Sequence, residues 1–340
     1  MQRVAMALLL SVAAVHLTAD EAPLVDGFKE TVFSVRDLDA AIELYREVGG
    51  WEVLLRGRAG SDLARFWKLE PKQVIEEALL ANPGDDRGYL RLVHFPGAEP
   101  EIIRPGAMPW DTGGIFDVNV RVKDVHAKLA DLRRHGWQSF SDPVEFTFGK
   151  FVVREVLAQG PDGIVLAMIE RVQPPLEDWP NLRQLSFIFN ATQTVRDFDR
   201  SFNFYTEKLG FKVYLEHEGA SREAGPHVLG LPHNLAAEIP RRVAIMSPKG
   251  DNFGSVEILA FRGAEGRDFS DRAKPPHLGH LSLRFPVSNL ETYLTQLRSR
   301  DVEPISGPAT VQIAPYGRVR GIVVRAPEGA WLEFLELPGE

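Results

Sequence analysis

The chain repeats itself, and this repetition constrains its fold more than any other feature. The stretch VRDLDAAIELYREVGGWEVLL, residues 35–55, aligns without a gap with VRDFDRSFNFYTEKLGFKVYL, residues 195–215. Each copy predicts the end of a strand, a helix capped near Asp37 or Asp197, and a glycine before the next strand. A repeat at a fixed offset indicates repeated structural units, so the two halves of the chain are expected to share one fold.

The repeat continues beyond these helices. GYLRLVHFPG, residues 88–97, matches GSVEILAFRG, residues 254–263. FGKFVVREVLAQGPDGIVLAMIE, residues 148–170, matches YGRVRGIVVRAPEGAWLEFLE, residues 316–336, and both predict a hairpin around a Pro-acid-Gly turn. These matches divide the chain into four repeated units, which start near Phe28, Ile115, Leu185 and Leu278.

Each unit has the pattern strand–helix–strand–strand–strand and cannot bury both faces of its sheet alone. The expected fold is therefore α+β, with four βαβββ units paired into two cup-shaped curved sheets and the helices outside. We expect the first two units to form an N-terminal domain, residues 26–172, and the last two a C-terminal domain, residues 184–340. The proline-rich segment between them, residues 173–183, is the expected linker.

Composition limits the possible partners and chemistry. The 340 residues carry a net charge of −8 without a run of Lys or Arg, which argues against a nucleic-acid partner. The chain has no cysteine, so disulfides, thiol catalysis and thiolate metal sites are excluded. The expected partner is a small-molecule substrate, and the expected assembly is a monomer or a homodimer.

The N-terminal segment has the order of a secretory signal peptide. One basic residue, Arg3, precedes an apolar run from Val4 to Leu17, which is short for a membrane span. We expect residues 1–22 to be this signal, the mature chain to lack a membrane span, and the protein to be periplasmic or secreted. An irregular N-terminus on a cytoplasmic protein is the alternative.

The V-x-D-(L/F)-D…FY stretch and the PDG/PEG…LE ending resemble the vicinal oxygen chelate superfamily over nearly all of residues 28–338. This superfamily includes glyoxalase I, bleomycin resistance proteins and extradiol dioxygenases. The resemblance implies that each cup takes metal ligands from the first and last strands of its two units. Its members catalyse different reactions, so it implies fold more specifically than reaction.

The resemblance places Asn190, Glu257, His280 and Glu333 at the four ligand positions of the C-terminal cup. Two carboxylates and an imidazole suit one divalent ion such as Zn, Ni, Fe or Mn, and the ion would compensate Glu257 on an otherwise apolar strand. Glu333 or Glu257 would be the catalytic base. The alternative is that Glu257 pairs with an arginine, Arg318 or Arg320, and that His280 is a core histidine.

The same positions in the N-terminal half are Glu30, Arg91, Asp117 and Ala167. No cation site is expected there, because Arg91 can neutralise Glu30 and Asp117 without a metal.

Weaker candidates lie near the C-terminal cup. Tyr316 and Arg318 precede one of its strands and would touch substrate, with a structural role at the turn as the alternative. His227 and His233 belong to the long segment 217–242, which would be either a lid over the cup or a set of exposed turns.

The preferred hypothesis is a metal-dependent lyase or isomerase of glyoxalase type, acting on a small substrate that chelates the ion through two oxygens. An extradiol-type Fe(II) dioxygenase is the first alternative, although its two-His, one-Glu site departs from this set. A binding protein without turnover is the second.

Overall fold

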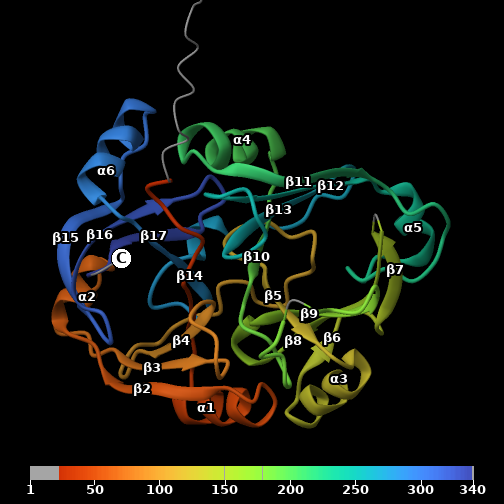
Figure 1. Cartoon of the computed structure of the whole chain (residues 1–340), viewed down its shortest axis with the longest axis horizontal. Coiled ribbons are helices and arrows are strands. Elements are labelled where there is room, and N and C mark those ends of the chain that lie inside the picture. The colour runs from red at the N-terminus through yellow and green to blue at the C-terminus, as the bar shows by residue number, and fades with distance from the viewer. Residues whose placement is uncertain (1–22, 149, 178, 339–340) are drawn as a thin grey trace, which may run out of the picture.

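Two curved sheets and a few short helices make up the protein (Figure 1). The computed structural model describes residues 23–148, 150–177 and 179–338, so the predicted signal peptide lies outside the described residues. No helix within these ranges is long and apolar enough to cross a bilayer. The predicted α+β fold of four βαβββ units, paired into two cup-shaped sheets, is confirmed.

The first sheet has eight strands in the order β15-β16-β17-β14-β1-β4-β3-β2. Its strands are β1 (Glu30–Ser34), β2 (Glu52–Arg58), β3 (Glu76–Ala81), β4 (Tyr89–His94), β14 (Gly279–Pro286), β15 (Ser306–Ile313), β16 (Gly317–Arg325) and β17 (Trp331–Glu336). It therefore joins the first unit of the chain to the fourth.

The second sheet has nine strands in the order β11-β12-β13-β10-β5-β9-β8-β6, and β7 also pairs with β8. Its strands are β5 (Asp117–Val122), β6 (Gln138–Ser139), β7 (Val144–Phe148), β8 (Phe151–Gln159), β9 (Val165–Gln173), β10 (Asn190–Thr194), β11 (Lys212–Gly219), β12 (Arg241–Ser247) and β13 (Ser255–Phe261). This sheet joins the second unit to the third.

This pairing corrects the expected one, in which each half of the chain formed its own cup. The third unit follows the second through the segment 173–183, which therefore connects two units of one sheet. The outer units meet because β1 pairs antiparallel with β14. Glu30 and Arg284, which face each other in that pair, form a buried ion pair at 3.1 Å.

The helix of each unit begins at a polar cap. Asp37, Asp124, Asp197 and Asn289 each accept a hydrogen bond from the backbone N–H three residues ahead, at 2.9–3.0 Å. The cap gives a hydrogen-bond acceptor to a backbone N–H of the first turn that has no partner within the helix, and it fixes where the helix starts. The four helices are α1 (Leu38–Glu47), α3 (Val125–Arg134), α4 (Phe198–Asn203), which continues as a π-helical turn (Phe204–Lys208), and α6 (Leu290–Ser299).

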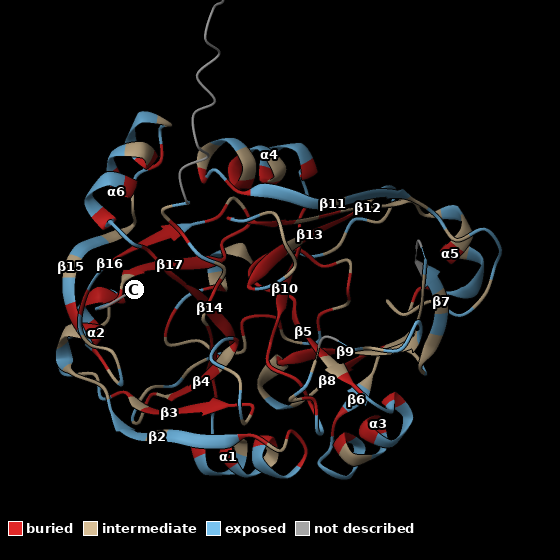
Figure 2. Cartoon of the chain, in the orientation of Figure 1, coloured by how far each residue is buried: buried red, intermediate tan, exposed pale blue. Residues whose placement is uncertain are grey.

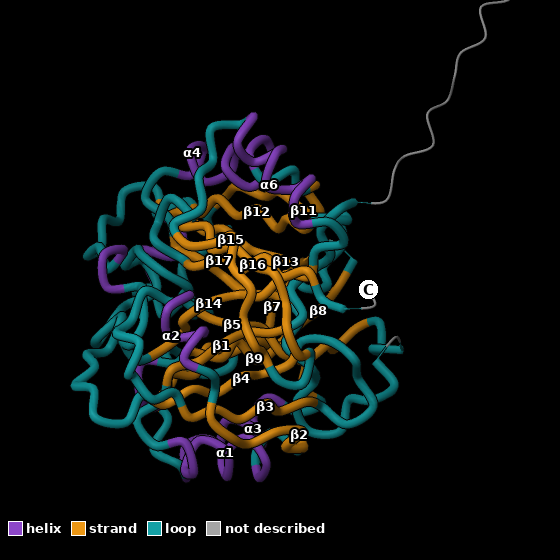
Figure 3. Tube along the Cα trace, turned by 90° about the vertical axis from the view of Figure 1, so that its left-hand side faces the viewer, coloured by secondary structure: helices purple, strands orange, loops and turns teal. Residues whose placement is uncertain are grey.

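These four helices cover the outer sides of the sheets, at the top and bottom of Figures 1 and 3. One large apolar cluster contains their buried side chains together with the outward residues of both sheets, such as Val118, Val120 and Val122 of β5. The edge strands β2 and β11 remain exposed (Figure 2). The smaller helical segments are α2 (Ser61–Phe66), α5 (His233–Glu238), η1 (Pro161–Gly163) and η3 (Ser270–Arg272).

Candidate functional site

The concave face of the first sheet, which we call the first cup, contains a buried network of opposite charges. Arg91 donates two hydrogen bonds to Glu30, at 2.8 and 2.9 Å, and one to Glu77 at 2.7 Å. Arg284 donates to Glu30 at 3.1 Å and to Glu333 at 3.0 Å. These five side chains are at most 4% exposed. Each carboxylate here therefore pairs with a guanidinium group. The expected pairing of Arg91 with Glu30 is confirmed, but the expected pairing with Asp117 is wrong, because Asp117 lies on β5 of the second sheet.

Aromatic side chains close the first cup. Trp67, next to α2, donates its indole N–H to Glu333 at 3.1 Å, and Tyr316 donates its hydroxyl to Glu30 at 2.7 Å. Burial alone would raise the pKa of Glu30, but Arg91 and Arg284 lower it to about 2. The cup is thus packed and internally compensated.

The predicted metal-ligand set is divided between the two sheets. Asn190 and Glu257 lie on β10 and β13 of the second sheet, whereas His280 and Glu333 lie on β14 and β17 of the first. The four residues cannot share one ion, so this set is wrong as a single site. The physical reason is the pairing of units, which places the third and fourth units in different sheets.

His280 is not the repeat equivalent of Asn190. The cap of α6 is Asn289, so Val287 corresponds to Val195 and the residue equivalent to Asn190 is Ser282. A shift in the pairing of β1 with β14 beside His280 places this residue against the outer core.

His280 is a core histidine, as in the alternative considered from the sequence. It is 3% exposed, and its ring packs edge-on against Phe33 at 4.6 Å between centroids. Its Nε2 accepts a hydrogen bond from the backbone N–H of Val165 at 3.0 Å. Burial, reinforced by Arg104, lowers the pKa of His280 to about 3, so the imidazole is neutral at physiological pH.

Replacing His280 with alanine should therefore destabilise the protein without affecting metal content. The substitution leaves a cavity and an unpaired amide at Val165, which together should cost about 2–4 kcal/mol in the free energy of unfolding. Urea denaturation measures this loss, and the exposed His126→Ala is the matched control, expected within about 0.5 kcal/mol of wild type. A folded His280→Ala protein that loses a bound ion present in wild type would contradict this assignment.

The concave face of the second sheet, which we call the second cup, carries a connected row of polar side chains. Glu257, Thr192 and Asp117 lie on three neighbouring strands at paired positions. Asn119 donates from its side-chain nitrogen toward Asp117 at 3.1 Å, Asn190 at 2.8 Å and Thr192 at 3.2 Å. Asp117, Asn119, Asn190 and Thr192 are buried, whereas Glu257 is partly exposed.

Three carboxyl groups of the second cup lie within electrostatic range of one another and form no ion pair among the described residues: Asp117, Glu155 and Glu257. Burial raises the pKa of Asp117 to about 7, although Arg104 and hydrogen bonds act against it. Burial and then Asp117 raise the pKa of Glu155 to about 8. Burial, Asp117 and Glu155 raise the pKa of Glu257 well above its usual range. The cluster therefore holds protons at neutral pH.

The connection between β11 and β12, residues 220–240, covers part of this cup (Figure 1). Val228 and Leu229 pack against an inward cluster that includes Ala167 of β9. His227 is half-buried, and burial, followed by Arg241, lowers its pKa to about 4. His233 is exposed at the start of α5, as expected for an exposed turn residue, whereas His227 lies next to the packed Val228 and Leu229.

The two predicted substrate contacts lie elsewhere. Tyr316 belongs to the first cup through its bond to Glu30, and Arg318 is exposed on β16. Arg320 pairs with Glu291 and Glu336 at the surface, so neither arginine is the partner of Glu257.

The donor geometry of the described residues does not fit a single-ion site. No three His, Asp or Glu side chains among them lie close enough together to hold one metal ion. In the second cup, three of the four repeat-equivalent ligand positions carry Asp117, Asn190 and Glu257, but the fourth is Ala167. The side-chain oxygen of Asn190 already accepts a hydrogen bond from Asn119.

The sequence matches the profile of the Glyoxalase/Bleomycin resistance protein/Dioxygenase superfamily over residues 27–168 and 188–334. The chain belongs to this superfamily. The two matched segments agree with the tandem repeat, each covering two of its four units. No curated protein matches the sequence.

Solved structures show the same superfamily fold. Glyoxalase I from Zea mays is similar at a TM-score of 0.58 and 15% identity, with 92% of each chain covered. A putative dioxygenase from Bacillus subtilis is similar at a TM-score of 0.57 and 11% identity, covering 93% of this chain and 87% of that one. At these identities the likeness concerns the fold alone.

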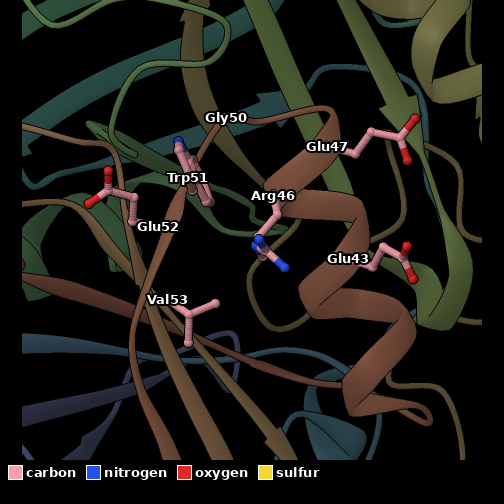
Figure 4. Close-up of a pocket in the computed structure, with 7 residues that line it drawn as sticks. All are labelled: Glu43, Arg46, Glu47, Gly50, Trp51, Glu52 and Val53. Atoms are coloured by element: carbon pink, nitrogen blue, oxygen red, sulfur yellow. The ribbon is translucent and has the colours of Figure 1, made fainter.

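A separate surface hollow lies between α1 and β2 (Figure 4). It is lined by Glu43, Arg46, Glu47, Gly50, Trp51, Glu52 and Val53. None of these residues belongs to either cup, so the hollow is not part of the candidate site of this superfamily member.

Proposed function

We propose that the second cup binds a small molecule and exchanges protons with it through its own carboxyl groups. The observation that carries this proposal is the cluster of Asp117, Glu155 and Glu257, whose pKa values are raised and which form no ion pair among the described residues. In the first cup every carboxylate pairs with an arginine and is sealed from solvent. In the second cup Glu155 and Glu257 remain partly exposed and have no such partner among the described residues.

The pKa values suit acid–base chemistry. A general acid or base works best when its pKa is near the working pH, and burial raises the pKa of Asp117 to about 7 and, together with Asp117, that of Glu155 to about 8. Such groups can remove a proton from a carbon beside a carbonyl and return it at a neighbouring atom. This is the proton transfer of an isomerase or lyase of glyoxalase type.

A metal-dependent version is the second candidate. Asp117, Asn190 and Glu257 occupy three repeat-equivalent ligand positions, and this observation favours them as the residues that would hold a divalent Zn, Ni, Fe or Mn ion. A bound ion would supply Lewis-acid activation of the substrate. The second cup fits such an ion poorly, because Ala167 at the fourth position has no side-chain atom that can bind a metal. An Fe(II) dioxygenase is less supported still, since none of the four repeat-equivalent positions of the second cup carries a histidine.

Deuterium exchange tests the proposal. Small hydroxy ketones and dicarbonyl compounds are incubated with the protein in D2O and chelator, and exchange of the C–H beside the carbonyl is followed by NMR. We expect exchange with wild type and a loss of at least ~100-fold in Glu257→Gln, the size typical of a general acid–base group. Glu43→Gln, an exposed change on helix α1, should exchange as wild type.

Other outcomes separate the alternatives. Exchange that requires added Zn, Ni, Fe or Mn, together with a rise in melting temperature lost in Glu257→Gln, would favour the metal-dependent version. Ligand binding without any exchange would overturn proton transfer in favour of a binding protein without turnover.

A further inference from the structure

Two arginines lie side by side at one end of the second cup. Arg121 is on β5 and Arg171 on β9, and these parallel strands place Arg121 beside Ile169, two residues before Arg171. Arg121 shares the inward face of β5 with Asp117 and Asn119, because the intervening valines belong to the outer core. Both guanidinium groups therefore belong to the polar lining of the cup.

Neither arginine forms an ion pair within the described part of the chain. The Nε–H of each is buried and has no hydrogen-bond partner there. Aromatic rings hold the side chains instead: Arg171 lies 3.9 Å from the ring centre of Phe151, and Arg121 lies 4.7 Å from that of Phe189. Rings stabilise a cation but accept no strong hydrogen bond, so donors of both groups stay available.

The positive charges repel each other. Burial, followed by Arg171, lowers the pKa of Arg121 to about 10, and burial lowers that of Arg171. Glu155 lies within electrostatic range of Arg121 but forms no ion pair with it, and burial and Asp117 outweigh Arg121 and raise the pKa of Glu155 to about 8. The phenol of Tyr214 lies within electrostatic range of both arginines. The two arginines are partly exposed, but their Nε–H groups are buried, and two like charges held this close together are costly unless an anion compensates them.

We propose that Arg121 and Arg171 form an anion-binding subsite of the second cup, which takes the carboxylate or phosphate group of its ligand. The inference rests on the proposed function, because it assigns the charge of the molecule bound there. Guanidinium groups bind both kinds of oxyanion through paired N–H donors. The ligand class is therefore a small organic anion whose other end reaches the carboxyl cluster.

Binding of inorganic phosphate and of benzoate tests the subsite, each measured by NMR titration at constant ionic strength against chloride. We expect wild type to bind at least one of them specifically, and the one that binds distinguishes phosphate from carboxylate recognition. Arg171→Gln should weaken that binding by at least ~10-fold while the protein stays folded. Arg171→Lys should recover part of it, since the charge remains but the paired donors are lost.

Arg154→Gln is the matched control. Arg154 lies on the adjacent strand β8 but is paired with Glu145 and Glu170, so its loss should leave anion binding unchanged. Equal weakening in both variants, or no specific binding by wild type, would overturn the subsite. If proton exchange persists and still depends on Glu257 in that case, only the subsite is wrong. If phosphate binds specifically but no ligand exchanges protons, the proposed function fails and the subsite stands.

Discussion

Replacing Arg91 with methionine is expected to lower the free energy of unfolding by about 3–5 kcal/mol, the usual cost of removing one partner from a buried ion pair. Arg91 is fully buried and donates three hydrogen bonds to the carboxylates of Glu30 and Glu77. Methionine fills similar space but leaves both carboxylates without this partner. Urea denaturation at pH 7 measures the change.

A surface pair in the same sheet provides the control. Arg58 pairs with Glu76 at 3.2 Å, but its side chain is 72% exposed. Exposed ion pairs contribute at most about 1 kcal/mol, so Arg58→Met should be nearly neutral. If Arg91→Met cost no more than Arg58→Met, the charge network would not be what stabilises the first cup.

The four units of this fold could be predicted because the sequence signals for their helices and strands are local. Helix caps and strand periods depend on a few neighbouring residues, and Asp37 and Asp197 cap their helices as expected. The repeat then supplied the number of units. None of these features depends on which unit pairs with which.

The pairing of units could not be predicted, because their four first strands are physically equivalent in pattern. Each carries a polar residue at the repeat-equivalent inward position, Glu30, Asp117, Asn190 or Ser282, so any two could form the central pair of a sheet. What distinguishes the pairs is complementarity across the interface, such as Glu30 with Arg284. Arg284 was not identified as a site residue, although an arginine inside an apolar strand was a signal for it.

The second cup was only partly recognised for the same reason. Asp117 was assigned to the N-terminal half, so its proximity to Glu257 was not foreseen. Glu155 and Arg121 were missed altogether. The pattern DVNVRV of β5 carried a signal, since its polar residues alternate with valines that face the outer core.

Replacing Glu257 with glutamine should stabilise the protein at alkaline pH. Glutamine keeps the shape of a protonated glutamate but removes a charge that burial, Asp117 and Glu155 all oppose. An acid whose pKa is raised on folding contributes its stability below its unfolded pKa, near 4.5, and loses it as pH rises toward the folded pKa. The free energy of unfolding of the variant should therefore exceed that of wild type at pH 8.5, and the difference should grow as the pH rises above 4.5.

The most direct test of this proton-holding carboxyl cluster is the free energy of unfolding of wild type and Glu257→Gln in urea, at pH 5.0 and 8.5 with chelator present. We expect the stabilities of the two proteins to be closest at pH 5.0, near the unfolded pKa of a glutamate, and the variant to be clearly more stable at pH 8.5. Glu43→Gln should show no such divergence. A Glu257→Gln protein that is less stable than wild type at both pH values would mean that Glu257 has a cationic partner, and would contradict the account.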